Sequence, residues 1–190
     1  MNDKNRIRMK IKSVLAGISP DRAAKAGKDA ADILRRQREF VDARSVMIFL
    51  PLPGEIDTRE IARAAWAAGK RVAAPRIRAP GVMDAVEIRS LNNGLEPGVM
   101  NILEPVDNGI MAVGELDLIV APALAFDRSG NRLGRGGGFY DRFISQNCGT
   151  LVCGLAFDLQ LIDKVPAREH DRAVNMLATN TEFLRFGREQ

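Results

Sequence analysis

This 190-residue chain alternates between short apolar runs and segments in which apolar residues recur at helical spacing. The apolar runs are bounded by proline, glycine and polar residues, as is typical of strands buried in a parallel sheet. Predicted strands cover residues 46–50, 72–75, 86–91, 116–125 and 151–157. Since predicted helices lie between them, we expect an α/β fold with a three-layer, Rossmann-like arrangement, in which helices flank a mostly parallel sheet. No repeat or linker divides the sequence, so we expect residues 1–190 to form a single domain.

Helix boundaries are predicted from capping residues and apolar spacing. The first segment is expected to be an amphipathic helix, because its apolar residues have helical spacing; they are Ile7, Ile11, Val14, Leu15 and Ile18. Ser19 followed by proline is a typical helix start, and the second helix is expected to run to about Phe40. Thr58 and Gly69 bound a third helix, and residues 139–146 form a fourth. The segment 92–105, rich in asparagine, proline and glycine, is expected to be a loop.

Composition favours a protein with a sizeable core that binds a small anion. Hydrophobic residues make up 46% of the chain, and the net charge is +4 at pH 7. Nucleic acid is not the expected partner, because aromatic residues, which stack on bases, make up only 5%. No apolar stretch approaches the roughly 18 residues of a membrane span, and no signal peptide is recognised. We therefore expect a cytoplasmic protein, a monomer with small-molecule substrates and no membrane partner.

Cysteine and histidine chemistry is largely disfavoured. Cys148 and Cys153 are too few for a disulfide framework and lack the C-x-x-C spacing, so we expect reduced thiols near a buried strand. His170 is the one histidine in the sequence, and no Ser-His-Asp or Cys-His set can be argued around it. An exposed, non-catalytic histidine is expected, and covalent nucleophilic catalysis is disfavoured.

The segment 131–142 carries the most specific chemistry of the chain. Four glycines fall within five positions, with Arg132, Arg135 and Arg142 around them. Glycine lets the backbone approach a ligand closely, and successive free N–H groups in such a turn form an anion site. Arginine matches phosphate oxygens, and the carboxylate of Asp141 suits magnesium. Neither G-x-G-x-x-G nor a P-loop ending is present. The segment is expected to hold a phosphate chain with its metal, although glycine-rich turns that bind nothing share this composition.

Residues 132–142 resemble the signature R-L-G-x-G-x-G-[YF]-Y-D-R of the 5-formyltetrahydrofolate cyclo-ligase family, also called methenyltetrahydrofolate synthetases. Other segments agree with the family in order and spacing; they are residues 4–8, 49–58, 69–76, 121–127 and 166–171. The resemblance spans nearly the whole chain, and the glycine loop is its most specific part.

The resemblance implies an enzyme with ATP as co-substrate and Mg²⁺ as cofactor. The implied ATP-binding residues are Lys4, Asn5, Arg6, Ile7, Arg8, Arg132, Leu133, Gly134, Arg135, Gly136, Gly137, Gly138, Phe139 and Tyr140. Asp141 and Asp171 are implied as metal ligands, and Arg135 and Tyr140 as catalytic residues. Arg135 would brace charge on the transferred phosphoryl group. Taken without the resemblance, the basic N-terminal residues also fit a solvated helix face, and Asp141 fits an acid at a helix start.

The resemblance also implies a folate site. Its residues would be Arg8, Leu52, Glu55, Asp57, Arg135, Gly136, Gly137, Gly138 and Phe139. Leu52 would pack on the folate, while Glu55 and Asp57 would accept hydrogen bonds from the pterin amino and ring N–H groups. Without the resemblance, the two carboxylates are equally well explained as acidic residues at the start of the helix near Thr58.

The implied reaction converts 5-formyltetrahydrofolate to 5,10-methenyltetrahydrofolate, with ADP and phosphate released. The γ-phosphoryl group of ATP passes to the formyl oxygen, the N10 amine attacks the phosphorylated formyl intermediate, and phosphate leaves. Because the substrate supplies both nucleophile and electrophile, the protein need only position the groups and stabilise charge.

Three positions depart from the family pattern. Gly137 stands where some members carry lysine, Phe139 replaces the commoner tyrosine, and Asn175 sits where some relatives have an acid. Two other functions stay open at this point. One is a family relative that binds a nucleotide and another anionic metabolite; the other is a basic, non-enzymatic RNA-binding module with salt-sensitive affinity.

Overall fold

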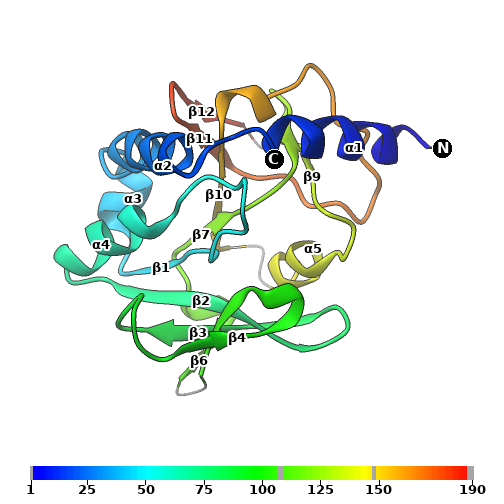
Figure 1. Cartoon of the computed structure of the whole chain (residues 1–190). Coiled ribbons are helices and arrows are strands. Elements are labelled where there is room, and N and C mark those ends of the chain that lie inside the picture. Colours follow the sequence, from blue (N-terminus) through cyan, green and yellow to red (C-terminus); the bar gives the residue numbers. More distant parts are fainter. Residues whose placement is uncertain (1, 107–108, 147–148, 188–190) are drawn as a thin grey trace.

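A central sheet organises the computed structural model, which describes residues 2–106, 109–146 and 149–187. In the described residues its strand order is β12-β11-β10-β7-β1-β2-β3-β6 (Figure 1). Strands β11, β10, β7, β1 and β2 are parallel to one another, while β12, β3 and β6 run antiparallel to their neighbours. The strands are β1 (Ser45–Met47), β2 (Arg71–Ala79), β3 (Val82–Ile88), β6 (Ile110–Met111), β7 (Leu118–Ala121), β10 (Leu151–Ala156), β11 (Met176–Thr179) and β12 (Phe183–Arg185).

Helices cover both faces of this sheet, which confirms the predicted α/β fold with a mostly parallel sheet. The helices are α1 (Asp3–Leu15), α2 (Pro20–Leu34), α3 (Arg38–Asp42), α4 (Arg59–Ala67) and α5 (Phe139–Ile144). Alternate strand residues face opposite layers, as the two-residue strand period requires. Val46 and Leu118 pack with the helices α1 to α4, whereas Met47 and Ile119 pack with α5. Figure 1 shows α2, α3 and α4 together on one side of the sheet and α5 on the other.

The prediction that one helix runs from Ser19 to about Phe40 was wrong about where this helix ends. The Ser19 hydroxyl caps α2 as expected, but α2 ends at Leu34 and α3 begins separately at Arg38. Leu34 and Phe40 are both buried, and six residues along one helix would turn them about 240° apart. The break lets both side chains reach the core. Val14, which we expected on the apolar face of the first helix, is exposed.

Several strand boundaries also differ from the prediction. Residues 92–105 form a hairpin instead of a loop, with strands β4 (Leu95–Pro97) and β5 (Leu103–Pro105) joined through the 3₁₀ turn η1 (Val99–Asn101). The strand expected at 116–125 ends at Ala121, and β11 and β12 were not predicted. The remaining short elements are β8 (Ala125–Phe126), β9 (Arg132–Leu133), η2 (Val113–Glu115) and η3 (Asp158–Gln160). Within the described residues, no helix combines the length and apolarity needed to cross a membrane.

Candidate active site

The glycine loop and the loop after β1 lie at the carboxyl edge of the parallel strands, as predicted. Two cavities meet there, one on each side of the glycine loop, defined as Gly134 to Gly138. We call them the polar cavity and the apolar cavity. Arg132, Gly134, Gly138 and Asp141 line both of them, so a ligand in one cavity adjoins a ligand in the other.

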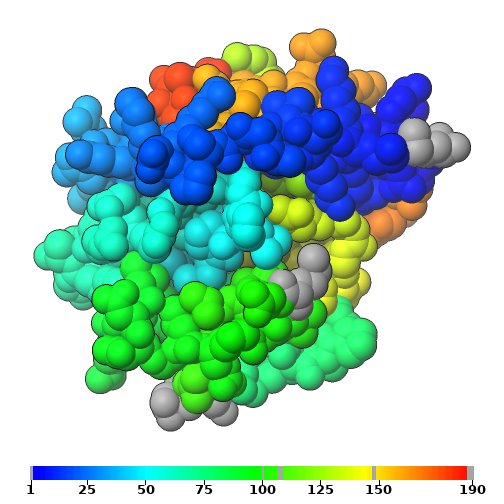
Figure 2. Space-filling view, in the orientation of Figure 1, coloured from blue at the N-terminus to red at the C-terminus, as the bar shows by residue number. Residues whose placement is uncertain are grey.

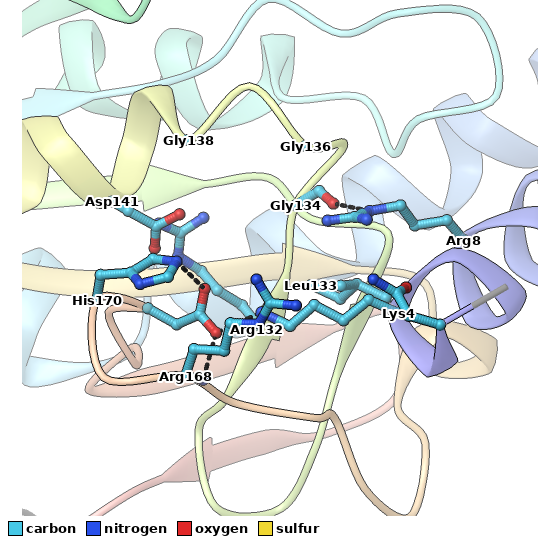
Figure 3. Close-up of a pocket in the computed structure, with 12 residues that line it drawn as sticks. Lys4, Arg8, Arg132, Leu133, Gly134, Gly136, Gly138, Asp141, Arg168 and His170 are labelled. Carbon is cyan, nitrogen blue, oxygen red and sulfur yellow. Dashed lines mark hydrogen bonds and ion pairs between the residues drawn. The ribbon is translucent and has the colours of Figure 1, made fainter.

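The polar cavity, about 280 Å³ in volume, is built from three distant parts of the sequence (Figure 3). They are the first residues of the chain, the glycine loop with its flanks, and the segment 168–171. The lining residues are Asn2, Lys4, Arg8, Arg132, Leu133, Gly134, Gly136, Gly138, Asp141, Arg168, His170 and Asp171. Four lysine and arginine side chains against two carboxylates give this cavity an excess of positive charge, which suits an anionic ligand.

Helix α1 lies against the glycine loop through one of its faces. Lys4 and Arg8, one turn apart, point to the same side. Lys4 Nζ donates to Asp171 Oδ2 at 2.5 Å, and Arg8 Nε donates to the Gly134 carbonyl at 3.0 Å. Figure 2 shows the N-terminal segment directly beside the surface formed by the glycine loop and α5. One face of the N-terminal helix therefore lines the polar cavity and is not simply solvated.

The other predicted N-terminal residues do not line either cavity. Asn5 accepts a hydrogen bond from Arg8 Nη1 at 2.8 Å and so supports that arginine from behind. Arg6 pairs with the exposed Asp3 on the outer side of the helix, and Ile7 packs against the core.

Arg132 and Asp141 form the pair that joins the two cavities. The Arg132 side chain is only 3% exposed, and its Nη2 donates to Asp141 Oδ1 at 2.8 Å. Its Nε donates to the Arg172 carbonyl, and its guanidinium carbon lies 5.8 Å from the centre of the Tyr140 ring. Burial lowers the pKa of the Arg132 guanidinium, while the Asp141 charge acts in the opposite direction. Arg132 thus needs Asp141 as its counter-charge.

Asp141 and Asp171 line the same cavity. The prediction that both bind one magnesium ion requires this arrangement. Asp141 Oδ1 accepts from Arg132 and from the Arg172 N–H, and Asp171 Oδ2 accepts from Lys4 and the Arg168 N–H. Burial, the largest single effect, raises the pKa of the Asp171 carboxyl, but the hydrogen bonds from Lys4 and the Arg168 N–H, together with the Lys4 charge, lower it overall, so the group is ionised at neutral pH.

The donor set fits magnesium at a phosphate site. No group of three metal-ligating side chains occurs in the described ranges, so these two carboxylates are the available pair. Magnesium at such sites is held through one or two carboxylates together with substrate phosphates and water. Asp141 Oδ2 and Asp171 Oδ1 accept no hydrogen bond in the described part of the chain.

The glycine loop presents its backbone N–H groups to the site. None of the N–H groups of residues 134–138 donates a hydrogen bond within the part of the chain that the structure describes. Gly136 and Gly138 have φ angles of +116° and +65°, which glycine adopts readily. At Gly137, where relatives can carry lysine, an added Cβ would lie 2.8 Å from the Phe139 ring, so a side chain there requires that ring to move. Free N–H groups in a tight turn are the predicted anion site.

The apolar cavity, about 330 Å³ in volume, lies on the other side of the glycine loop. Its walls come from the glycine loop with the start of α5, the segment after β1, the strands β2 and β3, and the β4–β5 hairpin. The lining residues are Lys12, Phe49, Leu50, Leu52, Glu55, Pro75, Ile77, Met83, Val99, Ile102, Glu104, Pro122, Ala123, Arg132, Gly134, Arg135, Gly137, Gly138, Phe139, Tyr140 and Asp141. A cavity of this size, lined by apolar side chains and glycine together with six charged residues, suits a flat ligand that is apolar in part.

Arg135 and Glu55 face each other in this cavity. Glu55 Oε1 accepts from Arg135 Nη2 at 2.6 Å and from Arg135 Nε at 2.9 Å, and Glu55 Oε2 accepts from the Leu52 N–H at 3.0 Å. The predicted folate residues Leu52, Glu55 and Arg135 are therefore brought together. In the structure, Glu55 already has a cationic partner.

Asp57 lies apart from both cavities, although we expected it in the folate site. Its Oδ1 accepts from the Arg59 N–H at 2.9 Å, and both of its oxygens accept from the Arg59 side chain. Burial raises the pKa of Asp57, but its bonds with Arg59 prevail and lower it. This is the alternative that the sequence left open, an acidic residue at the start of α4. Thr58 supports the same turn, since its hydroxyl donates to the Phe49 carbonyl.

The hydroxyl of Tyr140, a residue that lines the apolar cavity, is buried and makes no hydrogen bond with the described residues. Burial raises the pKa of the phenol, so it stays protonated and can donate. A buried hydroxyl without a partner is costly, which makes Tyr140 a ready donor to a bound ligand.

Some lining residues were not predicted. Arg168 and His170 line the polar cavity, and Lys12 and Glu104 line the apolar one. His170 is exposed, as expected. Lys12 follows Lys4 and Arg8 at four-residue steps, and that spacing was the available signal. Cys153 is a buried free thiol, as predicted, and Cys148 falls outside the described residues.

Comparison with known proteins identifies the family. A sequence model described as the 5-formyltetrahydrofolate cyclo-ligase family matches residues 1–180. A 5-formyltetrahydrofolate cyclo-ligase of Escherichia coli K12 is 35% identical over 162 residues, covering 81% of this chain and 87% of its own. The Mus musculus protein of the same name is 29% identical over 184 residues, covering 90% of this chain and 91% of its own. The solution structure of Aquifex aeolicus 5,10-methenyltetrahydrofolate synthetase superposes with a TM-score of 0.85 at 25% identity, over 98% of this chain and 95% of that one. With these matches along nearly its whole length, the chain belongs to the 5-formyltetrahydrofolate cyclo-ligase family.

Proposed function

We propose that this protein uses ATP to close 5-formyltetrahydrofolate to 5,10-methenyltetrahydrofolate, releasing ADP and phosphate. The observation that carries the proposal is the pair of adjoining cavities. A cation-rich cavity suits a triphosphate, an apolar cavity suits the folate rings, and the glycine loop forms a wall of both. The phosphate end of ATP and the formyl group of the folate can therefore meet at this loop.

In the polar cavity, the N–H groups of the glycine loop bind phosphate oxygens, and Lys4, Arg8 and Arg132 supply positive charge. Asp141 and Asp171 hold Mg²⁺, which neutralises charge on the phosphates when bound. Arg132 keeps the Asp141 carboxylate in place through their hydrogen bond. The two carboxylates that hold the metal are oriented by their hydrogen bonds with Arg132 and Lys4.

In the apolar cavity, the folate rings pack on Leu52 and Phe139. The γ-phosphoryl group passes to the formyl oxygen, so the γ-phosphorus–oxygen bond to ADP breaks and a new one forms. N10 then attacks the formyl carbon, the carbon–oxygen bond to phosphate breaks, and the N10 proton passes to water or phosphate. Arg135, at the loop between the cavities, braces charge on the moving phosphoryl group, and the Tyr140 hydroxyl donates to the reacting oxygens. Neither role needs a protein nucleophile.

Absorbance of methenyltetrahydrofolate tests this function. The purified protein with 5-formyltetrahydrofolate, ATP and Mg²⁺ should form product, and omission of ATP or of magnesium should abolish it. If ATP stabilises the protein in a thermal-shift measurement but no product forms, and sugar phosphates or acyl-CoA stabilise it where folates do not, the chain serves another anionic metabolite. We also expect the protein to act as a cytoplasmic monomer and residues 1–190 to behave as one domain in unfolding measurements.

A further inference from the structure

We propose that Glu104 recognises the pterin ring by accepting hydrogen bonds from its 2-amino and N3–H groups. The inference rests on the proposed function, because it names how the folate is bound. Those two N–H groups lie side by side on one edge of the ring and match the two oxygens of a carboxylate. Neither sequence motif nor resemblance pointed to this residue.

Glu104 is held inside the apolar cavity by the β4–β5 hairpin. It lies on β5, is only 7% exposed, and lines the same cavity as residues of the glycine loop. Gly98 makes room for it, because a Cβ at position 98 would lie 2.3 Å from the Glu104 carboxyl carbon. The hairpin therefore places a third carboxylate in this cavity, in addition to those of Glu55 and Asp141.

The charge of Glu104 has no cationic partner among the described residues. The other two carboxylates that line this cavity are each paired, Glu55 with Arg135 and Asp141 with Arg132. A buried carboxylate without a counter-charge is costly unless hydrogen-bond donors surround it. Glu104 is thus the lining carboxylate with the greatest need of further donors.

Its oxygens have capacity left for a ligand. Oε1 accepts from the Val99 N–H and Oε2 from the Ile77 N–H, each at 3.2 Å, the long end of the usual range. A carboxylate accepts about four hydrogen bonds, so one position on each oxygen is open. An adjacent pair of N–H donors can fill both. The two hydrogen bonds from backbone N–H groups orient the carboxylate. The open acceptor position on each oxygen can then bind the ligand.

A substrate analogue separates recognition from a purely structural role. The rate constant kcat/KM is measured for 5-formyltetrahydrofolate and for its 2-desamino-2-methyl analogue, which lacks the amino donors. We expect the wild-type protein to prefer the natural substrate by about 10- to 100-fold, the usual effect of a hydrogen bond to a charged group. In Glu104→Gln the preference should fall to about threefold or less, with KM for ATP unchanged, because an amide presents one oxygen and no charge.

Glu96→Gln is the matched control. Glu96 pairs directly with Glu104 in the hairpin register but is 54% exposed and lines neither cavity. It should keep the wild-type preference. A wild-type preference near one, or a Glu104→Gln variant that keeps the full preference, overturns the inference, and the first result needs no variant to fold. If the wild-type protein forms no methenyltetrahydrofolate at all, it is the proposed function that fails.

Discussion

The two cavities that meet at the glycine loop differ in how their charges are balanced. In the polar cavity, both carboxylates already have cationic partners, Asp141 with Arg132 and Asp171 with Lys4. In the apolar cavity, the Arg135–Glu55 pair lines the same walls as Glu104, which has no cationic partner among the described residues. In the polar cavity, ion pairs thus fix both carboxylates in position. In the apolar cavity, Glu104 remains able to bind donors of a ligand.

This difference indicates where each kind of substitution should act. Removing one member of an ion pair in the polar cavity leaves another charge without its partner, so effects on stability and on phosphate binding should appear together. Removing the charge of Glu104 in the apolar cavity leaves no cation without its partner, so the effect should be mainly on substrate discrimination. Variants on the two sides of the loop can test this division.

The largest effect is expected from Asp141→Asn. Losing a magnesium ligand should lower turnover by about 1000-fold or more, since metal coordination contributes several kcal/mol to the transition state. The buried Arg132 would also lose its counter-charge. Breaking a fully buried pair costs about 3–5 kcal/mol, and because the Asp141 side chain is 22% exposed we expect about 2 kcal/mol, with the fold retained. Turnover against magnesium concentration and thermal unfolding measure the two effects.

Asp3→Asn is the control for this prediction. Asp3 is an exposed aspartate at the start of α1, where it pairs with Arg6 and lines neither cavity. Its variant should match the wild-type protein in both measurements, because exposed ion pairs contribute at most about 1 kcal/mol. Near-normal turnover of Asp141→Asn at limiting magnesium would remove Asp141 from the metal site.

The sequence predicted the layers of the fold better than its connections. The apolar runs around Val46, Leu118 and Val152 are buried strands, because continuous apolar sequence needs cover on both faces. The β4–β5 hairpin was not predicted, because its prolines and glycines indicate a loop when the sequence is considered without the strands that pack against it. The hairpin is held against the sheet by contacts between residues far apart in the sequence, such as the hydrogen bond from the Ile77 N–H to Glu104. Such contacts leave no local pattern.

The site was predicted to a similar degree. The glycine loop marked both cavities, and the resemblance brought in Lys4 and Asp171, which are 167 positions apart and hydrogen-bonded. Asp57 was expected in the folate site but lines neither cavity. Its carboxylate is bonded to Arg59, and spacing alone does not reveal which way a turn directs a side chain. Glu104 had no signal, because its importance depends on burial and on the lack of a cation nearby.

The next effect in size should come from Arg135→Ala. We expect kcat to fall about 100-fold, with KM for ATP changed less than about threefold, because the loop N–H groups still bind the ground-state phosphates. Arg132, which lines both cavities, can compensate in part. The structure adds a second explanation to test, namely that Arg135 matters only as the partner of Glu55.

Glu55→Gln separates these explanations, because it weakens the same pair and keeps the guanidinium. If Arg135 acts on the transferred phosphoryl group, Glu55→Gln should lower kcat far less than Arg135→Ala does. Equal losses in kcat would make the pair itself the functional unit. A large rise in KM for ATP with unchanged kcat in Arg135→Ala would instead make Arg135 a plain nucleotide anchor.

The smallest effect is expected from Arg8→Ala, which tests whether α1 belongs to the polar cavity in function as well as in position. Arg8 contacts the Gly134 carbonyl and faces the loop, so its loss should raise KM for ATP by about 10-fold, the typical contribution of one charge-assisted hydrogen bond. The midpoint of thermal unfolding should stay nearly unchanged, because the side chain carries little core packing. Arg6→Ala is the matched control, since Arg6 lies two residues away on the same helix and pairs with Asp3 on the exposed side. If Arg8→Ala binds ATP and folate as the wild-type protein does, the contact with Gly134 only docks the helix, and the positive charge of the polar cavity must act through Lys4, Arg132 and Arg168 alone.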